Sequence, residues 1–178
     1  VVVLEHPGSD AAAVQGLLEG RQSFDGAAAL RDRLADLAAV VEAQQRGDLN
    51  IPGTEVVLMG HSLGALTALL ASGAELVPGM AQRCEAALAG LPLTNLSELL
   101  QCELAAGRVL EIKAMDPPPR AVVGLNSFGG LIWPHRASRA LPIPLLMVGG
   151  TLDLITPPLD EQLALLAGLA EHPASRVV

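Results

Sequence analysis

A serine between two glycines is the feature of this sequence that could do chemistry. Residues 60–64 read Gly-His-Ser-Leu-Gly, which places Ser62 at the centre of a Gly-x-Ser-x-Gly pattern. The run 54–59 before it predicts a short buried strand, and the run 62–72 predicts a helix. A serine at such a strand-to-helix turn presents its hydroxyl for attack, while the backbone N–H of Leu63 points to where an oxyanion would form. This context favours a nucleophile elbow over the alternative, a glycine-rich turn with an incidental serine.

The two glycines of the pattern have a steric role in this interpretation. Strand and helix approach each other closely at an elbow, so a side chain at Gly60 or at Gly64 is expected to clash. The serine between them is expected to adopt a strained backbone conformation.

An acid to accompany the serine is predicted at Asp153. The run 144–148 predicts a buried strand, and Asp153 follows it in a glycine-containing turn. Ligands of open parallel sheets bind at the carboxyl ends of the strands, and the acid of such a triad follows the serine in the chain. The alternative is an aspartate that only shapes its loop through an Asx-turn. Asp116 precedes a strand and so lies at the wrong end, and Asp160 and Glu161 fall in the first turn of a predicted helix, whose dipole favours carboxylates.

The four histidines of the sequence offer no evident base. His6 ends the first predicted strand and either lines a pocket or caps a loop. His61 lies within the motif, and its side chain is expected to point away from the serine hydroxyl. His135 falls in a loop and is predicted to be a surface residue. His172 follows the acid in the right order, but it precedes a predicted strand at the opposite end of the sheet, whereas a base must come within about 3 Å of the serine oxygen.

The missing base leads to an expectation about the ends of the chain. The apolar run 1–5 predicts a buried strand already under way, and the run 176–178 predicts a strand just beginning. We therefore expect a piece of a longer protein, truncated at both ends, with the base in a loop beyond Val178 and a second oxyanion donor before Val1. A triad without its base loses several orders of magnitude in rate, so this chain alone is predicted to be essentially inactive. Localisation stays open between the cytoplasm and export, because a leader would precede Val1.

Composition limits the fold and the partners. The 178 residues fit one domain; about half are hydrophobic, and only Phe24, Phe128 and Trp133 are aromatic. A core of leucine, valine and alanine suits helices packed on a parallel sheet, and the alternation of strands and helices predicts an α/β fold with a doubly wound, mostly parallel sheet. The net charge of −8, without a basic cluster, argues against nucleic acid as a partner. No apolar run approaches the ~18 residues of a membrane span.

The segment 73–119 separates the predicted elbow helix from the next strand, 121–125, by far more than a usual loop of about 2–6 residues. It contains two helical pieces, 78–89 and 96–104. We interpret it as a helical lid inserted into a single core that spans 1–178, and we expect it to set specificity.

Two cysteines and two aromatic residues carry open alternatives. Cys84 and Cys102 both lie in the predicted lid. Their spacing fits no metal signature and two residues cannot complete a zinc site, so no metal is predicted. They form a disulfide if the protein is exported, or they stay as two separate buried thiols. Phe128 and Trp133 follow the strand 121–125 and either form a pocket wall or pack in the core.

The motif at residues 60–64, the glycine-containing turn at 149–153 and the order of strands and helices together resemble the alpha/beta-hydrolase superfamily. The resemblance covers nearly the whole chain apart from the lid. Glu5 and His6, followed by Ser9, are similar to bacterial predicted dienelactone hydrolases and the related platelet-activating-factor acetylhydrolases. The resemblance implies a serine esterase that acts on a small-molecule carboxylic ester, with a short acyl group, through a Ser-Asp-His triad and an acyl-enzyme, and without a cofactor.

Two departures from those families bear on the residue assignments. The acetylhydrolases carry their acid after the strand that here ends at Leu125, where this chain has Asn126, so the acid would move to Asp153. True dienelactone hydrolases use a cysteine nucleophile, and this chain has Ser62 at that place. The alternative functions are a non-catalytic binding protein of this fold, or a serine acyltransferase or thioesterase.

Overall fold

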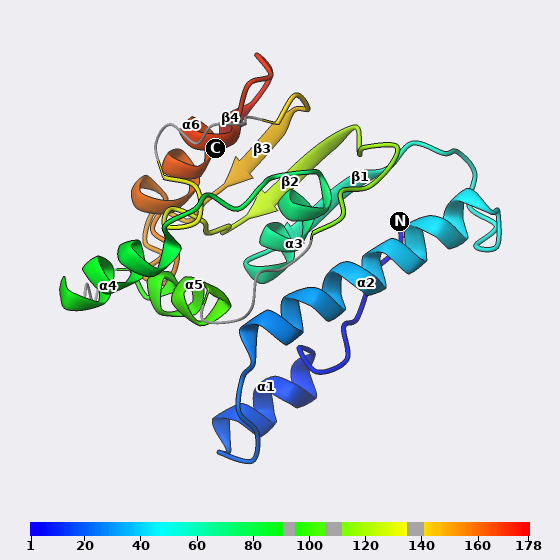
Figure 1. The fold of residues 1–178 in the computed structure, drawn as a ribbon. Helices are drawn as coiled ribbons and strands as arrows, with labels where there is room; N and C mark the ends of the chain where they lie inside the picture. The colour runs from blue at the N-terminus through cyan, green and yellow to red at the C-terminus, as the bar shows by residue number, and fades with distance from the viewer. Residues whose placement is uncertain (91–94, 106–111, 135–140) are drawn as a thin grey trace.

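The computed structural model describes residues 1–90, 95–105, 112–134 and 141–178, and it shows a sheet flanked by helices (Figure 1). The strands of the sheet, in spatial order, are β1 (Val57–His61), β2 (Ala121–Leu125), β3 (Leu145–Val148) and β4 (Arg176–Val177). Each neighbouring pair runs parallel. The predicted α/β class with a mostly parallel sheet is confirmed.

In chain order, helices lie between β1 and β2 and between β3 and β4, where they serve as crossovers between parallel strands. The described helices are α1 (Ala11–Leu18), α2 (Gly26–Gln45), α3 (Leu63–Ala71), α4 (Met80–Gly90), α5 (Ser97–Ala105), the π-helical turn η1 (Leu159–Leu163) and α6 (Ala164–Leu169). Helix α3 packs against β1 and β2, and α2 packs along α3, whereas α4 and α5 pack against each other away from the strands (Figure 1). Fully buried side chains of α3, β2 and β3, among them Leu66, Val122 and Met147, join sheet and helices in one core.

Helix α2 is amphipathic. Asp25 caps the helix by accepting a hydrogen bond from the Ala28 N–H at 2.9 Å. Leu30 and Val41 are buried, so one face of the helix covers the core while the opposite face stays in solvent.

The start of the chain differs from its prediction. Residues 1–6 form no strand, and Val1, Val2 and Val3 are exposed. An apolar run becomes a strand only when a neighbouring strand takes up its backbone hydrogen bonds, and in the described part of the sheet no strand pairs with this segment. The predicted buried strand at 1–5 is therefore wrong.

Strand β1 is present but is not buried on both faces as predicted. It begins at Val57 rather than at residue 54, and it reaches His61. Leu58 is buried against the core, whereas Val57 and Met59 are 58% and 68% exposed. The reason is position: β1 is the edge strand of the described sheet, and α3 covers one of its faces.

Both helical pieces expected in segment 73–119 are present as α4 and α5. Residues 91–94 and 106–111 of that segment lie outside the described residues, as does the predicted surface residue His135. Helix α5 also packs against α2, so the segment contacts the rest of the core directly. Its function as a lid stays a prediction. None of the described helices has the length and apolarity needed to cross a bilayer.

Candidate active site

Ser62 occupies the turn between β1 and α3, and its backbone has a conformation that residues other than glycine rarely adopt. Its φ is 51° and its ψ is −116°, and such a backbone costs about 1–3 kcal/mol that the surrounding structure must offset. The Ser62 N–H donates to the Leu125 carbonyl at 2.9 Å, and the Ser62 carbonyl accepts from the Ala65 N–H at 2.9 Å. The residue is therefore fixed by the sheet on one side and by the first turn of the helix on the other.

The steric expectation for the two glycines holds at one of them. A Cβ at Gly60 would lie 2.2 Å from the Gly64 carbonyl carbon, which is backbone and cannot move aside. A Cβ at Gly64 would meet only the end of the Arg33 side chain, at 3.4 Å. The prediction of a clash is thus wrong for Gly64, because its side-chain direction faces helix α2 rather than the strand.

Arg33 lies beside the elbow on helix α2. Its Nε donates to Thr67 Oγ1 at 3.1 Å and its Nη1 donates to Ser9 Oγ at 2.9 Å. Burial lowers the pKa of Arg33, and the neighbouring Asp36 carboxylate acts against that shift. These contacts hold a cationic side chain close to the N-terminal turn of α3, and no motif in the sequence had pointed to it.

Neither His6 nor His61 forms a hydrogen bond with Ser62 among the contacts of the described residues. His6 Nδ1 lies 2.9 Å from Asp36 Oδ2, and the His6 side chain is only 10% exposed, so it links the first loop to helix α2. This contact corresponds to the loop-capping alternative. His61 is exposed at the end of β1. Among the hydrogen bonds of the described residues, none joins a histidine to Ser62 or to Asp153.

His172 lies at the opposite end of the sheet, as predicted. His172 lines a groove of about 740 Å³. The other lining residues include ones that directly precede strands: Val56 before β1, Arg120 before β2 and Pro144 before β3. Ser62 follows β1 instead. The groove and the elbow therefore lie at different ends of the strands.

Asp153 is held in its turn by four hydrogen bonds. Oδ1 accepts from the backbone N–H groups of Ile155 at 2.8 Å and Thr156 at 3.0 Å. Oδ2 accepts from Thr156 Oγ1 at 2.8 Å and from Asn126 Nδ2. The contacts of Oδ1 are those of an Asx-turn, whereas the Asn126 contact crosses to the end of the neighbouring strand β2.

Two opposing effects act on the pKa of Asp153. Burial works to raise it, but the hydrogen bonds from Thr156, Ile155 and Asn126 stabilise the ionised form and together leave the pKa below its ordinary value. Asp153 is thus an anion at neutral pH, as an acid that orients an imidazole must be.

Parallel pairing brings Ser62 and Asp153 to the same edge of the sheet. Ser62 follows β1 and Asp153 follows β3, with β2 and its Asn126 between them. Neighbouring strands lie about 4.8 Å apart, so the ends of β1 and β3 are separated by about two strand spacings. The Gly149 N–H donates to the Val178 carbonyl at 3.0 Å, which brings the end of β4 to this edge as well.

Phe128 and Trp133 lie in the core rather than at an open surface. Both residues are 0% exposed, and Trp133 Nε1 donates to the Glu75 carbonyl at 2.7 Å. Their core-packing alternative is the one that the structure supports.

A second carboxylate, Glu161, is far more enclosed than Asp153. It is 1% exposed. Its Oε1 accepts from Asn95 Nδ2 at 2.8 Å, Ser97 Oγ at 2.8 Å and Gln101 Nε2 at 2.9 Å, and its Oε2 accepts from the N–H groups of Gly129 and Gly130 at 2.7 and 2.8 Å. We call these residues the Glu161 cluster. The sequence predicts for Glu161 only a favourable interaction with a helix dipole, because none of its hydrogen-bond partners is near it in the chain.

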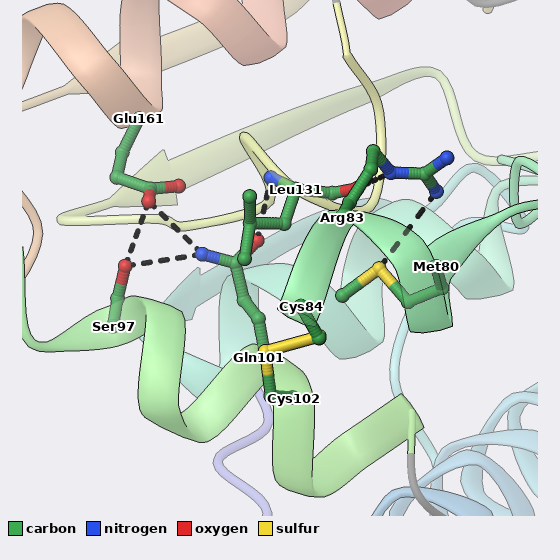
Figure 2. Close-up of a disulfide and its surroundings, with 8 residues drawn as sticks. All are labelled: Met80, Arg83, Cys84, Ser97, Gln101, Cys102, Leu131 and Glu161. Atoms are coloured by element: carbon green, nitrogen blue, oxygen red, sulfur yellow. Dashed lines mark hydrogen bonds between the residues drawn. A yellow bond between two sulfur atoms is a disulfide. The ribbon is translucent and has the colours of Figure 1, made fainter. Parts of the chain in front are cut away.

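The two cysteines form a disulfide next to this cluster (Figure 2). Cys84 of α4 and Cys102 of α5 are 5.5 Å apart at their Cα atoms. Arg83 Nε donates to the Leu131 carbonyl at 2.5 Å, and the Leu131 N–H donates to Gln101 Oε1 at 2.9 Å. The neighbours of both cysteines therefore bind the same residue of the loop that follows β2.

Neither a search for metal-binding groups nor comparison with known proteins assigns a function to further residues. Within the described ranges, no group of three or more His, Cys, Asp or Glu side chains is arranged to hold a metal ion. Comparisons with protein-family models, with curated proteins and with solved structures each found no match. Any functional conclusion therefore depends on the geometry of the Ser62 edge.

Proposed function

We propose that this chain is the core of a serine hydrolase that acts on carboxylic esters, with Ser62 as its nucleophile. The observation that carries the proposal is the positive φ of Ser62, at a turn where Gly60 allows β1 and α3 to meet. Strain of this kind persists where the rest of the structure enforces it, and it is concentrated at functional sites. The fold required is that of the alpha/beta hydrolases.

The proposed mechanism gives each residue of the edge a role. Ser62 Oγ attacks the ester carbonyl carbon, its proton passes to a base, and the Leu63 N–H stabilises the oxyanion. The tetrahedral intermediate expels the alcohol with a proton from the base, and water then hydrolyses the acyl-enzyme by the reverse sequence. Asp153 remains ionised and orients the base.

The base in this proposal is a histidine downstream of β4. A residue that follows Val178 would emerge at the edge that holds Ser62 and Asp153, because the Val178 carbonyl is bound to the Gly149 N–H at the end of β3. The proposal thus keeps the chain order of serine, acid and histidine. Residues 1–178 alone are expected to hydrolyse esters barely above the Ser62→Ala background.

Labelling with a fluorophosphonate tests the proposal, with imidazole added to take the place of the proposed histidine. Wild type is expected to be labelled at Ser62, and Ser62→Ala is expected to lose the label. Ser72→Ala is the matched control. Ser72 lies at the opposite end of α3 from Ser62, is buried, and donates its Oγ hydrogen to the Ala68 carbonyl. Equal labelling of Ser62→Ala and wild type, or no labelling of wild type, would overturn the proposed function.

One observation favours a second function, a non-catalytic binding protein of the same fold. In the described residues, neither Ser62 nor Asp153 is hydrogen-bonded to a histidine, and the acceptor positions of Asp153 are filled. A non-catalytic binding protein is expected to leave Ser62 unlabelled by the fluorophosphonate, whereas the esterase is expected to be labelled there. The same labelling experiment therefore separates the two functions.

A further inference from the structure

The Asp153 carboxylate has no acceptor position left for a base. An ionised carboxylate offers about four lone-pair positions, and Asp153 receives four donors: Ile155 N–H, Thr156 N–H, Thr156 Oγ1 and Asn126 Nδ2. An imidazole that binds Asp153 must therefore displace one of these donors.

Asn126 is the donor that can leave at the least cost to the fold. The Ile155 and Thr156 N–H groups belong to the backbone of the turn, and Thr156 is only 2% exposed. Asn126 is half-buried and donates through its side chain alone. Its backbone N–H is bound separately to the Val148 carbonyl at 2.7 Å, so the side chain can rotate while β2 and β3 stay joined.

We propose that Asn126 Nδ2 occupies the position on Asp153 Oδ2 at which the imidazole of the base binds, so that Asn126 is a positioning residue that controls access of the base to Asp153. This inference rests on the proposed function. Exchange of an amide N–H for an imidazole N–H keeps the carboxylate fully hydrogen-bonded and ionised. Asn126 follows β2, which lies between the strand that precedes Ser62 and the strand that precedes Asp153, so an imidazole at that place lies at the edge that holds both residues.

The reaction used to test this inference is the phosphonylation of Ser62 with added imidazole as the base. Imidazole donates its N–H to Asp153 Oδ2, and its other nitrogen takes the proton of Ser62 Oγ. The oxygen forms a bond to phosphorus and fluoride leaves with the electrons of the P–F bond. N-methylimidazole is the matched probe, since it can accept the proton but has no N–H to donate.

The variant Asn126→Gly removes the amide and suits the local backbone, because φ at Asn126 is 44°. Asn50→Gly is its control, since φ at Asn50 is 49° and the residue is exposed away from Asp153. With imidazole, Asn126→Gly is expected to be labelled at Ser62 about tenfold faster than wild type or Asn50→Gly, the factor that corresponds to the release of about one hydrogen bond. With N-methylimidazole, the three proteins are expected to react alike.

A second measurement does not depend on the reactivity of Ser62. Titration with imidazole is followed by the NMR signal of the Asp153 carboxyl carbon, which is expected to shift in Asn126→Gly at concentrations that leave wild type unchanged. Equal imidazole dependence of labelling in wild type and Asn126→Gly would overturn the inference, and so would a carboxyl signal that imidazole does not move in the variant. If Ser62 is never labelled but the Asp153 signal shifts, the proposed function fails and the assignment of the imidazole position stands.

Discussion

Asp153 and Glu161 are two carboxylates with saturated hydrogen bonding, yet they lie in different kinds of surroundings. Asp153 is half-buried, and three of its four donors come from its own turn. Glu161 is almost fully buried, and its five donors come from α5, the residues before it and the loop after β2. A carboxylate whose donors are distant in sequence stabilises the contact between separate segments of the chain. Asp153 has a single donor from outside its own turn, Asn126, so loss of that hydrogen bond is expected to leave the fold intact. Glu161 is therefore a structural carboxylate, whereas Asp153 is a candidate catalytic one.

The strongest test of this difference compares Glu161→Gln with Asp153→Asn. Glu161→Gln places an amide against buried donors, and it is expected to lower the free energy of unfolding by about 3 kcal/mol or more. Asp153→Asn keeps an acceptor for its own turn and is expected to cost about 1 kcal/mol. Urea denaturation measures both, with the exposed Glu171→Gln as a control that should change little. Equal losses in the two variants would remove the distinction.

Removal of the disulfide is expected to have the next largest effect on stability. The effect should be confined to the region around Glu161 and should not reach the edge that holds Ser62 and Asp153. The double variant Cys84→Ala, Cys102→Ala opens a link between residues 18 apart in sequence, which is expected to lower the free energy of unfolding by about 3 kcal/mol. Labelling of Ser62 in the folded protein is expected to be unchanged. Thermal denaturation with and without reductant gives the comparison: if reductant also destabilises the double variant, the disulfide is not the cause. A bond of this kind also favours an oxidising compartment.

A third test returns to the elbow and compares its two glycines. Gly60→Ala forces a methyl group against the Gly64 backbone and is expected to cost about 2 kcal/mol, with loss of Ser62 labelling. Gly64→Ala meets only a flexible arginine end and lies in a helix, where alanine is favoured over glycine by about 1 kcal/mol. Stability curves of the two variants should therefore move in opposite directions. A similar loss of stability in both variants would mean that a side chain at Gly64 also clashes where β1 and α3 meet, which would contradict this prediction.

The contrast between the two carboxylates also shows what the sequence could predict. Ser62, Gly60 and the turn at Asp153 belong to local patterns, so the order of strand, turn and helix in the sequence predicts their places in the fold. The donors of Glu161 are separated from it by 31 or more residues, and no periodicity or spacing marks such a contact. The Asn126–Asp153 bond spans 27 residues and depends on the pairing of β2 with β3, which also becomes visible only in three dimensions.

The predictions of burial for residues 1–5 and for strand β1 are wrong for a related reason, namely that contacts distant in sequence are not visible in a local pattern. The apolar run 1–5 and strand β1 were both predicted to be buried, because composition reports the preference of side chains but not the presence of a neighbour. Val57 and Met59 satisfy the pattern of a buried strand and are nevertheless exposed on an edge. A prediction of burial therefore needs a pairing partner as well as an apolar run.

The smallest expected effect concerns Glu98, which extends the comparison to pH. Burial raises the pKa of Glu98, as do the nearby Glu161 and Asp160 carboxylates, whereas the pKa of Asp153 is lowered. A raised pKa means that the folded state binds the proton more tightly, so ionisation of Glu98 reduces stability as pH rises through and above its unfolded value of about 4.3. Asp153 has the opposite sign: its contribution is present above about pH 4 and is lost as pH falls through its folded pKa.

Glu98→Gln should therefore stabilise the protein at pH 7 and lose that advantage in acid, while Asp153→Asn should destabilise it at pH 7 and approach wild type in acid. Urea denaturation from pH 3 to pH 7 gives both curves, with Glu85→Gln, on the neighbouring helix α4, as a control for the removal of one negative charge. If Glu98→Gln gained no more stability than this control at pH 7, ionisation of the half-buried Glu98 carboxylate would not reduce the stability of the fold. Glu98 would then belong with the solvated acids of the surface, and Glu161 alone would remain as the carboxylate on which the buried hydrogen bonds of the cluster converge.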